Sequence, residues 1–244
     1  MNQDYLFKEL RKGVTAARQI VATGYCTAEF MEDKQVEAVI VRDSETTRLP
    51  CKYDVQQAPA FQQHRNKEKI FSRVLTVCIS LPLKIEANDQ FYLNARDSQG
   101  ESMTLCSSKG KNIIKSLQDI NCSVDTVREE AGYLVIRGWA IDFEDVTIQL
   151  KDRETGEILA LPENMPEWYV RSDAMRCFTE CNQAKKIGFS MKLPLAWGEK
   201  NLSMQLQAGK SVHKENLRKS GEKPGGKYLN SLHVNLLRVY NNTK

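Results

Sequence analysis

Residues 134–140 (LVIRGWA) repeat the pattern of residues 20–26 (IVATGYC), a run of mostly apolar residues that ends in a glycine and an aromatic residue. Runs of this kind, rich in β-branched residues, are typical of buried strands. Four further pairs of matching segments follow in the same order. They are residues 36–42 and 146–151 with the polar turn after each, the Leu-Pro pairs at 49–50 and 161–162, residues 77–83 and 189–195, and residues 90–96 and 201–207. The offset between the copies stays between about 109 and 114 residues, which indicates an internal duplication.

Each copy has the pattern of six or seven short strands separated by turns, which is typical of an antiparallel sandwich. The sequence therefore predicts an all-β fold of two tandem β-sandwich units, of the immunoglobulin or jelly-roll kind, with short helices at the termini and in the linker. The expected segments are 13–106 for the first unit, 107–120 for the linker, 121–212 for the second unit and 213–244 for a basic tail. Residues 1–12 are expected to form a short helix, because their apolar residues can share one side.

The composition, with 41% hydrophobic and 27% charged residues, is that of a soluble globular protein. No stretch approaches the roughly 20 consecutive apolar residues that span a bilayer. The N-terminus has no basic segment followed by an apolar one, so no secretory signal is expected. We therefore expect a cytoplasmic protein.

The net charge of +4 is unevenly distributed, because residues 209–244 carry a net charge of +6 and the rest of the chain is near −2. The nearly neutral body argues against a nucleic-acid partner. Apolar residues at 229, 232, 236 and 240 predict a basic amphipathic helix in the tail. This helix could pack on the second unit, contact the inner face of the membrane, or lead into a further domain. The tail has no clear helix stop, which favours a chain that continues beyond Lys244.

The sequence contains no recognisable catalytic or metal-binding pattern. The seven cysteines include no CxxC pair, and Cys177 and Cys181, which could share a helix face, lack two further ligands at metal spacing. His64, His213 and His233 lie far along the chain from any catalytic Cys or Asp, and exposed positions are expected for them. The acidic residues 142–145 are expected to form a solvated turn. No cofactor is predicted.

Aromatic residues of the second unit suggest a ligand-binding surface. Trp139 lies in a predicted strand and is expected in the core. Trp168 and Trp197 fall in predicted loops, where an indole can stack on a sugar ring. With Tyr169, Arg171 and Asp173, they form the predicted ligand-binding set. The alternative is that Arg171 and Asp173 only hold their loop, which also includes a predicted helical turn over residues 174–181.

Four short elements of the second unit carry a resemblance to a known family: residues 138–142 (GWAID), a strand that ends in Asp152, residues 171–174 (RSDA) and residues 188–190 (GFS). Their order resembles that of the accessory β-domains that precede family 2 glycosyltransferases in Gram-positive bacteria, which build rhamnose-containing and other cell-surface polysaccharides. The first unit departs from the pattern, since Tyr25 replaces the tryptophan and the Arg-x-Asp and Gly-Phe elements are absent. The Asp-x-Asp motif of the catalytic domain is also absent from the chain.

This resemblance implies a non-catalytic accessory region of a glycosyltransferase, which binds glycan or positions a catalytic domain that follows it. The expected partners are a glycan, that C-terminal domain, and the membrane surface through the tail. Two alternatives remain open: a protein–protein interaction module with no glycan role, and an enzyme with an unfamiliar site.

Overall fold

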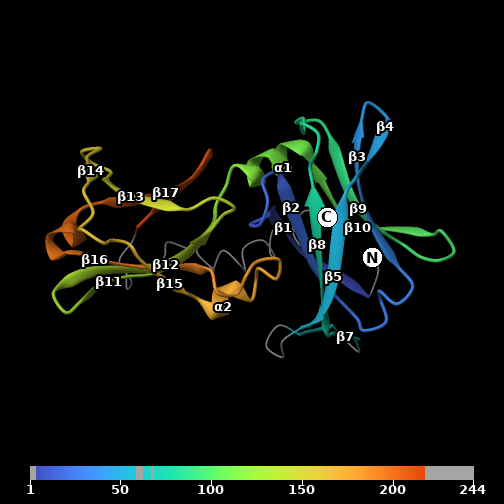
Figure 1. The fold of residues 1–244 in the computed structure, drawn as a ribbon, viewed down its shortest axis with the longest axis horizontal. Coiled ribbons are helices and arrows are strands. Elements are labelled where there is room, and N and C mark those ends of the chain that lie inside the picture. The colour runs from blue at the N-terminus through green and yellow to red at the C-terminus, as the bar shows by residue number, and fades with distance from the viewer. Residues whose placement is uncertain (1–3, 59–62, 67–68, 218–244) are drawn as a thin grey trace. The chain divides into compact units, whose positions relative to one another are not determined.

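The computed structural model describes residues 4–58, 63–66 and 69–217. The chain divides into two compact units, Met1–Leu117 and Gln118–Lys244, and each is described by itself (Figure 1). Antiparallel four-stranded sheets dominate both units, which confirms the predicted all-β fold of tandem β units.

The first unit contains two four-stranded sheets, with strand orders β1-β2-β8-β5 and β10-β9-β3-β4, and a small β6-β7 pair. Its elements are β1 (Tyr5–Lys12), β2 (Gln19–Cys26), β3 (Gln35–Arg42), β4 (Glu45–Leu49), β5 (Cys51–Gln57), β6 (His64–Asn66), β7 (Lys69–Phe71), β8 (Arg73–Ser80), β9 (Gln90–Arg96), β10 (Ser102–Lys109) and α1 (Gly110–Leu117). His64 is the first residue of the short strand β6.

The second unit repeats this topology, with strand orders β11-β12-β16-β15 and β14-β13-β17-β18. Its elements are β11 (Asn121–Glu130), β12 (Tyr133–Ile141), β13 (Thr147–Asp152), β14 (Ile158–Leu159), β15 (Glu167–Val170), α2 (Ser172–Met175), β16 (Lys186–Pro194), η2 (Leu195–Glu199), β17 (Leu202–Ala208) and β18 (Ser211–Asn216). Strand β11 corresponds to β1, β12 to β2, β16 to β8 and β15 to β5, and the other sheets match in the same way. The duplication seen in the sequence is therefore also a repeat of strand order.

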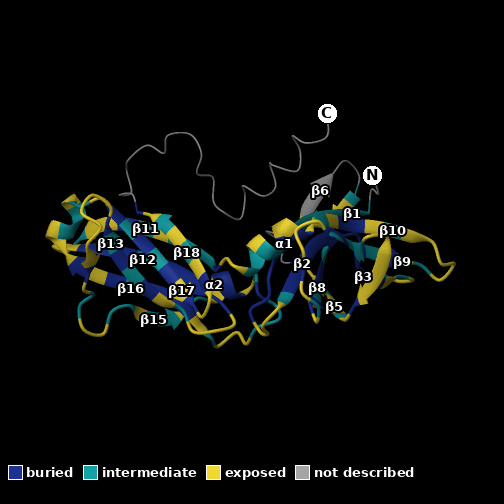
Figure 2. Ribbon diagram, turned by 90° about the horizontal axis from the view of Figure 1, so that it is seen from above, coloured by how far each residue is buried: buried dark blue, intermediate teal, exposed yellow. Residues whose placement is uncertain are grey.

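In each unit the two sheets pack face to face around one hydrophobic core, as in a sandwich. Alternate residues of each central strand point into the core, and β12 and β16 are mostly buried (Figure 2). The first core includes Ile20, Leu75, Val77 and Ile79 from one sheet and Ile40, Phe91 and Leu93 from the other. The second includes Leu134, Ile136, Phe189 and Met191 from one sheet and Leu150, Met204 and Leu206 from the other.

The predicted linker helix is present as α1 and packs on the first unit. Ile113 is fully buried, and Ile114 and Leu117 contact the same core. The first compact unit therefore extends to Leu117.

The predicted N-terminal helix is wrong, because Tyr5–Lys12 form strand β1, paired with β2 along its whole length. Tyr5, Phe7 and Leu10 pack against the core, although their spacing is not that of a regular strand. A break in register between Phe7 and Glu9 inserts one extra residue, so that Leu10 returns to the inner face. Because of this bulge, the inward-facing residues Phe7 and Leu10 are three positions apart, a spacing that is also typical of a helix.

The predicted basic tail begins inside β18, and the part after Leu217, including His233 and the amphipathic helix, lies outside the described residues. Within the described part of the chain, no helix is long and apolar enough to cross a membrane.

Candidate functional site

The Gly-Trp and Gly-Phe elements of the second unit are partners in one pair of strands. In the antiparallel register of β12 and β16, Gly138 lies opposite Phe189 and Trp139 lies opposite Gly188. A Cβ on Gly138 would come within 2.7 Å of Phe189 Cζ, so the glycine makes room for the opposite ring. Two dipeptides 50 residues apart thus form one interlocked structure, with one aromatic ring on each face of the sheet.

The outer face of this sheet carries Tyr169 and Arg171 above Gly188. Tyr169 pairs with Gly188 across β15 and β16. A Cβ on Gly188 would lie 2.7 Å from Tyr169 Cε2 and would also collide with Arg171 Cγ. The Gly-Phe element therefore serves both faces, because Phe189 fills the core and Gly188 lets two side chains lie close to the backbone.

Arg171 is held by two carboxylates. Its Nε and Nη2 donate to the two carboxylate oxygens of Asp173 at 2.8 and 2.6 Å, and its Nη1 donates to Asp125 Oδ2 at 2.6 Å. Such charge-assisted forks are the strong class of hydrogen bond. The fork with Arg171 lowers the pKa of Asp173 to about 2, and the two carboxylates raise the pKa of Arg171, so Arg171 and Asp173 are charged at neutral pH. The Arg-x-Asp element is thus a planar ion-pair cluster that ties the segment after β15 to β11.

Of the five predicted ligand-binding residues, the structure brings together Tyr169, Arg171 and Asp173. Trp168 lies in β15 and not in a loop, and it faces the core, with its ring 5.9 Å from that of Phe189 at 71°. Trp197 lies on η2 and also packs against the core in a partly buried position.

Asp125 completes this cluster and was missed by the sequence analysis. It lies at a break in register between Val124 and Thr126, where β11 carries an extra residue. Bulges of this kind re-aim a side chain. No local signal in the sequence marks it, because its partner Arg171 is 46 residues away.

Trp139 is buried as predicted, on the outer side of β12. Its ring meets Phe178 at 5.6 Å and 68°, and Phe178 belongs to the segment between β15 and β16. The predicted helical turn over residues 174–181 is wrong beyond its start, since α2 spans Ser172–Met175. Cys177 and Cys181 follow it in turns and share no helix face.

His213 is not the exposed tail residue that was predicted. It lies in β18, with Nδ1 2.8 Å from Asp119 Oδ1 and Nε2 3.2 Å from Glu215 Oε2. Hydrogen bonds to Asp119, Cys122 and Glu215 raise its pKa to about 12. The ring of His213 thus lies between the carboxylates of Asp119 and Glu215, which joins β18 to the segment before β11. This arrangement fits a charged structural clamp.

The acidic residues 142–145 were predicted to be exposed to solvent, and one of them is not. Asp142 is buried, and its carboxylate accepts a hydrogen bond from the Phe143 amide at 2.6 Å. Glu144 and Asp145 are exposed as predicted. Among the residues that the structure describes, no three His, Cys, Asp or Glu side chains form a group that could hold a metal ion.

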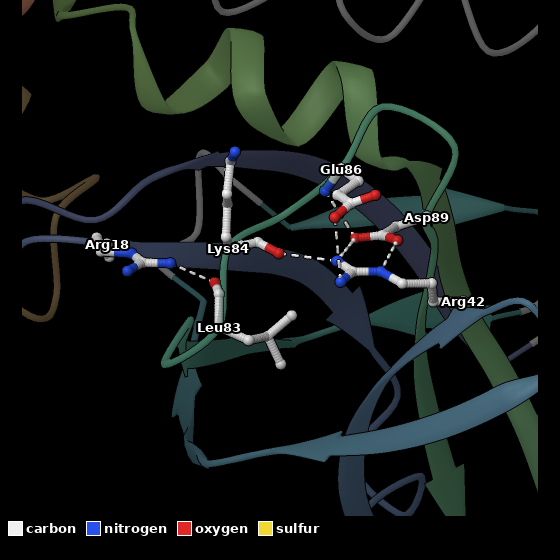
Figure 3. A network of polar contacts seen from close by, with 6 residues as sticks. All are labelled: Arg18, Arg42, Leu83, Lys84, Glu86 and Asp89. Carbon is white, nitrogen blue, oxygen red and sulfur yellow. Dashed lines mark hydrogen bonds and ion pairs between the residues drawn. The ribbon is translucent and has the colours of Figure 1, made fainter.

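The first unit has its own charged network, at the end of β3 (Figure 3). Arg42 donates to both oxygens of the buried Asp89 carboxylate at 2.8 Å and to the Lys84 carbonyl oxygen at 2.8 Å. Asp89 also accepts from the Glu86 amide at 2.8 Å. This network fixes the loop before β9.

The second unit places a pair of opposite polarity at the corresponding strand end. Asp152 is the last residue of β13, and its carboxylate lies 3.3 Å from Lys200 Nζ, in the loop before β17. In the first unit the basic residue, Arg42, lies at the end of β3, and its acidic partner lies in a loop. In the second unit the acidic residue, Asp152, lies at the end of the corresponding strand β13, and its basic partner lies in a loop. Each network lies at the end of a strand and ties that strand to a loop of its own unit.

No family model matches this chain, and no curated protein is similar to it.

Proposed function

We propose that this chain is a non-catalytic accessory region of a glycosyltransferase of cell-surface polysaccharide synthesis, and that the outer face of its second unit binds glycan. One observation carries the proposal. Three of the four elements that carry the resemblance, the Gly-Trp, Arg-x-Asp and Gly-Phe elements, meet around Gly188. Their convergence gives the motif a single location, and the first unit lacks this combination.

The chemistry of this face suits a sugar. The Tyr169 ring covers Gly188 and is partly exposed, so it can stack on a pyranose ring. Beside it, Asp125 and Asp173 keep lone pairs that can accept hydrogen bonds from hydroxyl groups. An apolar surface with a few fixed polar groups is the usual composition of a small-ligand site. The ligand-binding residues of the proposal are therefore Tyr169, Arg171, Asp173 and Asp125.

A protein–protein interaction module is the second candidate, supported by a different surface. Tyr133, at the start of β12, is 50% exposed and pairs with Pro194, and the next residue, Leu195, is 42% exposed. Exposed apolar groups that lie together are typical of protein contacts.

Titration with rhamnose-containing polysaccharide fragments, followed by tryptophan fluorescence and calorimetry, tests the first proposal. Tyr169→Ala should weaken binding by at least about tenfold, the loss that corresponds to roughly 1.4 kcal/mol of stacking. Tyr133→Ala is the matched control and should bind glycan like the wild type. No heat and no fluorescence change with any fragment would reject glycan binding.

The link to a glycosyltransferase has a separate test. The natural reading frame should continue after Lys244 into an α/β domain that carries an Asp-x-Asp motif. A stop codon at that point would reject the attachment to a catalytic domain and leave glycan binding to be judged by the titration.

A further inference from the structure

We infer that the outer face of the second unit selects uncharged, hydroxyl-rich glycans and rejects anionic ones. This inference rests on the proposed glycan-binding function and adds the substrate class. An arginine beside a tyrosine would ordinarily indicate a site for a carboxylate or a phosphate. The surroundings of Arg171 indicate the opposite.

Every nitrogen of the Arg171 guanidinium already donates to a carboxylate. Two of these hydrogen bonds go to Asp173 and one goes to Asp125, all between 2.6 and 2.8 Å. The side chain of Arg171 is only 21% exposed. The Nε–Nη2 edge, which can bind a carboxylate through two parallel hydrogen bonds, is therefore occupied by Asp173, and three of the five N–H groups already donate to carboxylates.

The net charge of the cluster is −1, from two carboxylates and one guanidinium. Asp173 is 67% exposed, so its outward lone pairs face solvent and the ligand. Elsewhere on this face, exposed Glu167 and Lys186 have opposite charges, Arg137 is paired with Glu130 at 3.0 Å, and exposed Lys192 lies further along β16. The negative charge is therefore local to the cluster. An anion that approaches Arg171 meets the exposed Asp173 carboxylate first, and a hydroxyl group meets an acceptor there.

Neutral sugars match what remains on this face. Their ring C–H groups can lie on Tyr169, and their hydroxyl groups can donate to Asp125 and Asp173. Ser123 Oγ, which donates to Asp125 Oδ1 at 3.3 Å, holds the second carboxylate in place. The ion pairs thus orient two hydrogen-bond acceptors and at the same time neutralise the cation that would attract acidic glycans.

Calorimetry of the full chain against a panel of trisaccharides tests the inference. The panel contains a rhamnose trisaccharide, galactose and glucose trisaccharides, and the galactose and glucose trisaccharides with their terminal C6 oxidised to a carboxylate. The strongest binder should be neutral, and both oxidised members should bind at least about tenfold more weakly than it at low salt. A strongest binder that carries a carboxylate, or oxidised members within tenfold of the best neutral sugar, would overturn the selectivity and leave glycan binding intact. Binding by no member of the panel would reject the selectivity together with the glycan-binding function.

Two substitutions separate this role from a merely structural one. Asp173→Asn removes the charged partner of Arg171 Nε and Nη2, and it should narrow the gap between neutral and oxidised sugars by at least about tenfold. Asp125→Asn removes the charged partner of Arg171 Nη1, and it should also narrow the gap between neutral and oxidised sugars. Either variant is compared with the wild type only after circular dichroism shows an unchanged fold. A gap that stays the same in both folded variants would contradict the inference.

Discussion

Gly188 shapes the outer face of the second unit because it has no side chain. Its position lets Tyr169 and Arg171 lie against the strand, while the register puts Trp139 beside it on β12. The Gly-Phe element is thus explained by two separate contacts, one on each face of the sheet. Residue type alone would have assigned the whole element to packing of the core.

The first residue-scale prediction concerns this close approach. Gly188→Ala should destabilise the chain by about 1–3 kcal/mol, the usual cost of overpacking a closely packed position, and it should displace Tyr169. Urea unfolding measures the loss. Ser190→Ala, two residues along the same strand, is the control and should change stability by less than about 0.5 kcal/mol. Equal stability of Gly188→Ala and the wild type would show that the contacts above Gly188 relax freely.

A second residue-scale prediction follows from the raised pKa of His213. The folded chain keeps a proton that the unfolded chain releases above about pH 6.5, so the stabilisation is complete below that pH and is lost as the pH rises towards 12. Between pH 7 and 9 the free energy of unfolding should fall more for the wild type than for His213→Asn, by about 1 kcal/mol after solvent screening of this partly exposed group. Urea unfolding at the two pH values gives this difference. Parallel pH profiles for the two proteins would mean that His213 is neutral in the folded state.

At the scale of elements, the junction of β10 with α1 is fixed by a close backbone contact. Gly110 donates its amide to the Asp89 carbonyl oxygen at 2.7 Å, and a Cβ at this position would collide with the Glu86 carbonyl oxygen. The loop that Arg42 and Asp89 hold in Figure 3 is therefore the surface on which α1 begins.

Gly110→Ala should have two opposing effects on the stability of the chain. Helix propensity alone would stabilise α1 by up to about 1 kcal/mol. The collision with Glu86 should outweigh this gain and leave the variant about 1–3 kcal/mol less stable. Thermal and urea unfolding measure the net sign. Lys111→Ala, at the exposed next position, should have a small effect, and a more stable Gly110→Ala would show that the loop moves aside.

The elements show which features a sequence can reveal. The central strands were predicted because each is a continuous apolar run with matching turns in two copies. Strand β1 was mistaken for a helix, because a bulge at Lys8 gives Phe7 and Leu10 helical spacing. Trp168 was placed in a loop, since a four-residue edge strand such as β15 has too few positions to show alternation.

The candidate site was predictable only in part for a related reason. Tyr169, Arg171 and Asp173 are neighbours in the chain, and the sequence could identify them together. Asp125, Asp119 and Glu215 act across strands, and nothing local relates them to Arg171 or His213. Ion pairs between distant segments depend on register, which is known only once the sheet is built.

At the scale of the whole molecule, each unit has its own pair of sheets and its own core, so each is expected to fold alone. All three tryptophans, at 139, 168 and 197, belong to the second unit. Tryptophan fluorescence of the full chain should therefore report the unfolding of that unit, with a urea midpoint equal to that of fragment 118–244. Fragment 1–117 should show its own cooperative transition by circular dichroism. A fragment without cooperative unfolding would show that the units depend on one another.

The shared strand order of the two units has a consequence for biosynthesis. Tandem domains of equal topology can exchange strands while they fold, because a strand from one copy finds a suitable place in the other. In such a hybrid, β3 in the place of β13 would bring Arg42 towards Lys200, and β13 in the place of β3 would bring Asp152 towards Asp89. Both mispairings place like charges together, which is unfavourable. The opposite polarity of the two networks would therefore disfavour an exchange of β3 and β13 between the two units during folding.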